Sequence, residues 1–257
     1  MSSSARISLS EKAYLAIRDE ILRGQLRPGT PLSRRRLARE LGMSVLPVTD
    51  ALRRLEGDGL VESRARAGTR VRVPSEKDVR ELYELREALE TQSARLFADR
   101  ATPAQRLELR HLGAQVDALF GRLAADASDP AFRFEVHSRH VELHMRVAEH
   151  AGSGILRQMI ERNHVLILNW LFDVAGRRTP LPPRFHSELV DALVSGDPAR
   201  ADAAMRAHVR YGLPEVASHI CAIEAPDWRE RRRRGPSAGE TAGPEPPPAT
   251  PTSEPSA

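Results

Sequence analysis

Four histidines in the second half of the chain have the chemistry and the spacing of metal ligands. His140 and His144 lie four residues apart, so both imidazoles share one helix face and can chelate one ion. His186 and His208 lie on apolar stripes of two other expected helices, and their imidazoles could complete the coordination sphere. A hydrogen-bonded core histidine is the ordinary explanation for any one of them. Four inward-facing histidines together favour a metal site.

Two other polar residues interrupt apolar stripes in the same half. Arg86 lies between Leu82 and Leu89, where an unpaired guanidinium would be costly to bury. Two explanations stay open: a structural ion pair with Glu90, four residues further on, or a guanidinium that binds a carboxylate effector beside the metal. Asn163 could line the same cavity, or it could be a buried amide that bonds to backbone.

A helical scaffold must position these side chains, and helical periodicity runs from Glu76 to about Ala222. Ser75 is expected to cap the first helix, and Thr102-Pro103 starts the second. The third covers about 130–149, the fourth includes 156–170, and the last two cover about 184–195 and 198–220. With no convincing strand pattern in this half, a six-helix bundle is the expected packing.

The stretch from Leu32 to Val61 has a different pattern, two short helices joined by a tight turn at Gly42. Ser44 is expected to cap the second helix, with Pro47 in its first turn. The inner faces are formed by Leu37, Ala38 and Leu41 in the first helix and by Val48, Leu52 and Leu55 in the second. After Gly57 and Gly59, the segments LVES and TRVRV, separated by RARAG, predict a two-stranded wing. Preceded by a helix from Glu11 to about Arg23, this layout is that of a winged helix-turn-helix, which places its second helix in a DNA groove.

The charge distribution agrees with a DNA-binding head. Residues 1–75 contain 15 Lys+Arg against 8 Asp+Glu, whereas the remainder contains 24 against 27.

Cys221 is the only cysteine, which excludes an intramolecular disulfide and disfavours a thiolate metal site. No apolar run approaches the length of about 18 residues that a membrane span needs, and the segment MSSSARISLS lacks the apolar core of a signal peptide. A cytoplasmic location is therefore expected.

The head resembles the DNA-binding domain of GntR-type bacterial transcription regulators over Tyr14 to Val73. The matching landmarks are Ile21–Gly24–Leu26–Pro28–Gly29, Leu37–Ala38, Leu41–Gly42, Pro47–Val48, Ala51–Leu52–Arg53–Arg54–Leu55 and Gly59–Leu60–Val61. The resemblance implies a dimer that binds a palindromic operator in double-stranded DNA.

The expected DNA contacts are Arg34, Arg35, Arg36, Ser44, Val45, Thr49, Arg53, Arg66, Gly68 and Arg70. The family usually carries arginine where Val45 and Thr49 stand, in a Ser-Arg-x-Pro-Val-Arg-Glu pattern. Two guanidinium forks for guanine are missing here, each of which could contribute about 1–3 kcal/mol of discrimination. Val45 and Thr49 could instead contact thymine methyl groups, and an operator unlike that of typical relatives is expected.

The second half resembles the FCD effector-binding domain of FadR-like GntR regulators, over roughly Val79 to Tyr211. The resemblance rests on YELREALE (83–90), HVELH (140–144) with AEHAGSGIL, FHSELVDALVSGD (185–197) and MRAH (205–208). In that family an acidic residue and three histidines hold a divalent metal below a ligand pocket. His144, His186 and His208 match the three histidines, and His140 replaces the acidic ligand. An additional imidazole favours zinc, with nickel or copper as alternatives, over manganese or calcium.

We therefore expect a mostly α-helical protein with a disordered N-terminal tail (1–9), a winged helix-turn-helix (10–74), a six-helix metal-, effector- and dimerisation domain (76–222) and a disordered Arg/Pro-rich tail (226–257). The predicted function is a ligand-responsive transcription regulator and not an enzyme, with repression that a small organic acid relieves. Two alternatives stay open: a metal sensor without an organic effector, and a histidine-site metalloenzyme fused to a DNA-binding head. The enzyme alternative lacks a general base, because no carboxylate shares the histidine stripes.

Overall fold

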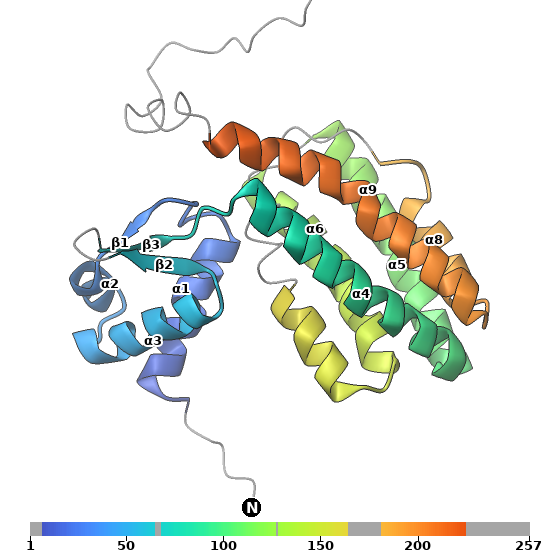
Figure 1. The fold of residues 1–257 in the computed structure, drawn as a ribbon, viewed down its shortest axis with the longest axis horizontal. Coiled ribbons are helices and arrows are strands. Elements are labelled where there is room, and N and C mark those ends of the chain that lie inside the picture. Colours follow the sequence, from blue (N-terminus) through green and yellow to red (C-terminus); the bar gives the residue numbers. More distant parts are fainter. Residues whose placement is uncertain (1–6, 65–67, 127, 164–180, 225–257) are drawn as a thin grey trace, which may run out of the picture.

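The computed structural model describes residues 7–64, 68–126, 128–163 and 181–224, which form an N-terminal head and a larger helical body (Figure 1). Each part has its own apolar core. The head core is built from α1, α2, α3 and the small sheet, and the body core from the helices that follow Ser75. Among the described helices, none combines the length and the low charge that a membrane span needs.

The head consists of three helices and a small antiparallel sheet. The helices are α1 (Leu9–Leu22), α2 (Arg34–Glu40) and α3 (Val45–Gly57), and the strands are β1 (Pro31–Leu32), β2 (Val61–Arg64) and β3 (Gly68–Val71). The strand order is β1-β3-β2, with Val61 opposite Val71 and Leu32 opposite Thr69. The predicted wing hairpin is confirmed, and the sequence analysis missed the two-residue β1 that extends it.

Local chemistry explains most of the helix ends in the head, with two corrections to the predictions. Ser8 caps α1, which begins at Leu9 rather than at Glu11, and Ser33 caps α2. Gly42 adopts a φ of 63° in the turn between α2 and α3, a conformation that favours glycine. Ser44 occupies the N-cap position of α3, but its side chain makes no capping hydrogen bond, so that expectation was wrong.

The body is all-helical in its described residues. It contains α4 (Glu76–Arg100), α5 (Pro103–Ala125), α6 (Pro130–His150), a helical segment at 154–163, α8 (Phe185–Leu193) and α9 (Pro198–Glu224). Ser75 with Asp78 and Thr102 with Gln105 form the capping boxes of α4 and α5. The predicted helical body is confirmed. Leu166, Trp170, residues 1–6 and the C-terminal tail lie outside the described residues, whereas Leu9, predicted in the N-terminal tail, already belongs to α1.

Three helices enclose the polar centre of the body. The most extensive helix–helix packing among the described residues is between α4 and α9, and α6 packs against α4 and α5 (Figure 1). The apolar residues at this centre include Val79, Tyr83, Phe97, Val136 and Met205, all buried. Arg86, Glu90, His144, His186 and His208 are buried among them. So many buried polar groups in one place need partners, which the next section identifies.

The position of α8 depends on a close approach to α5 at Gly113. A Cβ at Gly113 would lie 2.9 Å from Val190 Cγ2 and 3.5 Å from the His186 carbonyl oxygen. Gly121 on the same helix has nothing within 4 Å of such a Cβ. The absent side chain at Gly113 therefore sets the distance between α5 and the helix that carries His186.

We predict that Gly113→Ala lowers the free energy of unfolding by about 1–3 kcal/mol relative to Gly121→Ala, because the methyl group overpacks the α5–α8 contact. Gly121→Ala should be neutral or stabilising by up to about 1 kcal/mol, since alanine is the better helix former. Denaturant unfolding of both variants measures the difference. Equal stabilities would mean that the contact at Gly113 does not determine the helix spacing.

Candidate functional site

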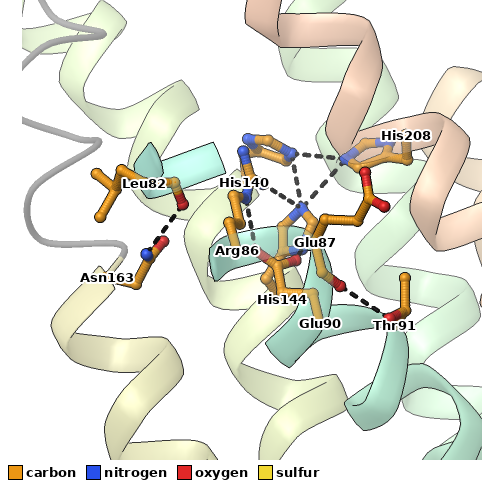
Figure 2. Close-up of polar contacts among 9 residues, drawn as sticks. All are labelled: Leu82, Arg86, Glu87, Glu90, Thr91, His140, His144, Asn163 and His208. Carbon is orange, nitrogen blue, oxygen red and sulfur yellow. Dashed lines mark hydrogen bonds and ion pairs between the residues drawn. The ribbon is translucent and has the colours of Figure 1, made fainter. Parts of the chain in front are cut away.

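Three of the predicted histidines meet at one point in the body. His140 and His144 come from α6 and His208 from α9, and their Nε2 atoms lie 3.0 Å (His140–His144), 3.1 Å (His144–His208) and 3.2 Å (His140–His208) apart. Figure 2 shows the three rings pointing toward one another above α4. Within the described part of the chain, these three nitrogens lie close enough together to bind one metal ion.

The three contacts cannot all be hydrogen bonds. An Nε2 atom is either a donor or an acceptor, so among three of them at least two are of the same kind. At least one of the three contacts therefore places two lone pairs or two protons face to face. A cation at the centre would make every contact favourable, because all three lone pairs would then point at positive charge.

The spacing also fits a metal ion. Nitrogens bound to one zinc ion at about 2.0–2.1 Å lie about 3.3 Å apart at tetrahedral angles. The same bond length gives about 2.9 Å at the right angles of an octahedral site. The observed 3.0–3.2 Å lies between the two.

Burial favours the neutral form of two of these imidazoles. It lowers the pKa of His140 and of His208 well below the ordinary value, because the imidazolium form loses its solvation. The neighbouring histidines lower both pKa values further. A neutral imidazole has a free lone pair, which is the form that binds a metal.

His186 lies beside this cluster and is oriented by Asp117 on α5. Its ring centroid is 5.0 Å from that of His140 and 5.4 Å from that of His208. One Asp117 oxygen accepts from the backbone N–H of His186 (2.9 Å) and contacts Nδ1 (2.8 Å), while the other accepts from the N–H and the hydroxyl of Ser187. Nε2 of His186 has no hydrogen-bond partner among the described residues, which leaves it available as a ligand.

The same contacts change the acidity of Asp117. Its partial burial raises the pKa, but the hydrogen bonds from His186 and Ser187 outweigh this effect and lower the pKa from 3.8 to about 2. The carboxylate also caps the first turn of α8, whose own N-cap residue, Arg184, makes no side-chain cap. Asp117 thus fixes the start of α8 and the His186 ring together.

Glu90 orients His144 in a similar way. One carboxylate oxygen accepts from Arg86 Nε at 2.5 Å, and the other pairs with His144 Nδ1. Burial opposes the charge on Arg86, but the Glu90 carboxylate outweighs it and raises the pKa of Arg86. The structural ion pair between Arg86 and Glu90 is therefore present. The spacing of Arg86 and Glu90 predicted this pair, whereas no sequence pattern indicated the contact of Glu90 with His144 or the role of Asp117.

A small cavity adjoins the cluster. It has a volume of about 20 Å³, enough for one ion or one water-sized group. Its walls include Arg86, Phe120, Phe185, Tyr211 and the rings of His140, His186 and His208. Asn163 is not part of this wall: its side chain donates to the Leu82 carbonyl oxygen at 3.3 Å, the backbone-bonded alternative (Figure 2).

The described residues among the expected DNA contacts all lie on the head. Arg34, Arg35 and Arg36 occupy the exposed first turn of α2, Ser44 and Val45 start α3, and Thr49 and Arg53 follow on it. Gly68 and Arg70 lie on β3, where Arg70 Nε donates to Glu62 at 2.5 Å. Arg53 lies 3.6 Å from Asp50. Arg66 lies outside the described residues.

A winged helix-turn-helix head followed by a helical body defines the class, a DNA-binding regulator with a second, all-helical domain. Family models agree: residues 9–71 match "Bacterial regulatory proteins, gntR family", and residues 81–211 match "FCD domain". The chain belongs to the GntR family and carries an FCD domain.

Relatives and solved structures are similar along most of the chain. A protein of Paenarthrobacter nicotinovorans named as a D-xylose utilization operon transcriptional repressor is 30% identical, with 80% of this chain and 88% of that protein covered. The transcriptional repressor GlaR of Escherichia coli is 28% identical over 79% of this chain and 93% of its own length. The structure of E. coli McbR/YncC has the same fold, with a TM-score of 0.66, 22% identity and coverage of 83% and 99%. The relatives are named as regulators, and the chain is a regulator rather than an enzyme.

We predict that His144 and His186 both carry a proton on Nδ1 in the metal-free protein, because Glu90 and Asp117 accept there. Long-range proton–nitrogen NMR on full-length protein labelled with ¹⁵N-histidine, after chelator treatment, distinguishes the tautomers. Single His→Gln variants assign the two rings. A proton on Nε2 of either ring would contradict the proposed orientation.

Proposed function

We propose that this protein is a cytoplasmic, homodimeric repressor whose body binds a divalent metal and a small carboxylate effector. Two relatives are named as transcriptional repressors, which supports repression rather than activation. A two-fold dimer would place two heads on a palindromic operator, in the usual manner of such DNA-binding proteins. Effector binding would shift the dimer between conformations with different DNA affinity.

The observation that carries this proposal is the meeting of three Nε2 atoms at 3.0–3.2 Å, two of them from the buried His144 and His208 and one from the partly buried His140. Because no choice of tautomers satisfies all three contacts, a cation is the simplest group that does. The ligands would be His140, His144 and His208, with His186 as the fourth. An all-imidazole donor set suits zinc first and nickel second, and it disfavours manganese and calcium.

A bound metal would supply a Lewis acid to which a carboxylate oxygen can bind. Within this chain, Glu90 and Asp117 keep the rings oriented, and Arg86 places positive charge at the cavity wall. Arg86 would pair with the effector carboxylate while it retains Glu90, since a guanidinium has five N–H donors. Asn163 was also expected at the effector, but its side chain bonds to the Leu82 carbonyl oxygen and does not line the cavity, so the proposed effector contact rests on Arg86.

A second candidate is a metal sensor without an organic effector. The cavity volume of about 20 Å³ favours it, because an organic acid needs more room than one water-sized group. For an acid to bind, side chains at the wall, such as Phe185 and Tyr211, must move. The two candidates share the metal site and differ only in this step.

Contacts between the body and the head offer a route for the signal. Arg162 Nη2, on the segment 154–163, donates to the Gly57 carbonyl oxygen at the end of α3 (2.6 Å) and lies 3.6 Å from the Asp58 carboxylate. Asp58 also accepts from the Tyr14 hydroxyl at 2.8 Å. The next residue of the segment, Asn163, is tied to α4 at Leu82. A shift of α4 against this segment would therefore reach the C-terminal end of α3.

We predict that the purified protein binds one zinc ion per chain and that His144→Ala weakens zinc binding by at least about 100-fold. Loss of an outer partner of a metal ligand already costs 10–100-fold, and loss of the ligand itself should cost more. Competition with a chromophoric chelator and elemental analysis provide the measurement. His111→Ala, an exposed histidine on α5, is the matched control. Equal zinc affinity in the two variants would remove the metal from the proposal.

A thermal-shift screen of small carboxylic acids on the zinc-loaded protein separates the two candidates. A ligand of the native state must raise the melting temperature. We expect a subset of acids to do so, with the effect lost in chelator-treated protein and in Arg86→Gln. Zinc stabilisation with no response to any acid would favour the metal sensor.

A further inference from the structure

The first turn of α3 presents apolar side chains to solvent. Val45 is 43% exposed and Leu46 is 70% exposed, whereas the apolar residues one turn later, Val48 and Leu52, are buried in the head core. In a winged helix-turn-helix this end of the second helix enters the major groove. The two exposed side chains therefore stand where base edges would lie.

Apart from the Ser44 hydroxyl, the polar side chains at this tip supply no free donor for guanine. The Thr49 hydroxyl donates to the Val45 carbonyl oxygen at 2.9 Å, so its proton is used within the helix. From Leu41 to Leu52 the sequence contains no lysine or arginine. The first basic side chain on α3, Arg53, lies beside Asp50 at 3.6 Å.

The same tip keeps groups that can hold phosphate. Ser44 makes no capping hydrogen bond, in contrast to Ser33, whose Oγ accepts from the Arg36 backbone N–H. The N–H groups of the first turn of α3 and the Ser44 hydroxyl are then available to a phosphate oxygen. Exposed Arg34, Arg35 and Arg36 add positive charge on the neighbouring α2. This basic setting favours DNA over an apolar protein partner as the group that covers Val45 and Leu46.

We infer that α3 recognises its operator through the 5-methyl groups of thymine, with Leu46 and Val45 as the specificity-determining residues. Apolar contact with that methyl group is the one distinction between bases in the major groove that needs no donor or acceptor. Leu46, the more exposed of the two, makes the larger contact, and the partly exposed Thr49 follows one turn further along α3. The inference rests on the proposed binding of operator DNA and specifies its chemistry.

Deoxyuridine provides the test, because it lacks only the methyl group of thymidine. Full-length protein selects sites from a random duplex library, and each thymine of a selected half-site is then replaced singly by deoxyuridine. We expect the wild type to lose about fourfold in affinity at each contacted thymine, the value of one buried methyl group. Leu46→Ala should lose this sensitivity at one thymine and Val45→Ala at another. Leu15→Ala, an exposed leucine on α1, is the control that retains it.

Two failures have different meanings. Selected sites that contain guanine at the contacted positions, or that bind equally well with deoxyuridine, would overturn the methyl contact and leave DNA binding intact. Enrichment of no duplex at all would overturn the proposed function itself, and this inference with it. Because Val45 and Leu46 are exposed, their alanine variants should keep the fold, which circular dichroism can verify.

Discussion

Three imidazole nitrogens held within 3.0–3.2 Å in a buried part of the protein are the constraint on which the body depends. Since no distribution of protons makes all three contacts attractive, the arrangement is unfavourable by itself and must be maintained by its surroundings. The surroundings are the packing of α4, α6 and α9 and the carboxylates that fix the rings. A metal bound to the three nitrogens, as proposed, would remove this cost, so binding there would be coupled to the stability of the body.

The four histidines come from three helices, α6, α8 and α9, so a ligand bound among them would act on several helices together. Glu90 on α4 reaches His144 on α6, and Asp117 on α5 reaches His186 on α8. His208 comes from α9, the helix that packs most extensively on α4. A ligand drawn to these rings would therefore tighten contacts across the whole body. The hydrogen bond from Arg162 to Gly57 at the end of α3 would carry such a change to the head.

Much of this architecture could be predicted from local chemistry. Helix starts at Ser75, Thr102 and Pro198 follow capping rules, and the histidines lie on inward faces because helical periodicity places them there. The rest could not be predicted, because it depends on contacts between helices. The reach of Asp117 to His186, the second contact of Glu90 and the small cavity volume all need the packed structure. The capping hydrogen bond predicted for Ser44 is absent, because a residue can occupy the N-cap position without using its side chain as the acceptor.

Hydrogen exchange of the full-length protein, measured by mass spectrometry with zinc and after chelation, tests most directly whether the body controls the head. The account predicts slower exchange with zinc in α6 and α9, and also in the segment 154–163 and at the C-terminal end of α3 around Gly57. It predicts little change in α1 near Leu9. Zinc-dependent protection confined to the body helices would contradict the account, because the metal site would then be structural and without influence on DNA binding.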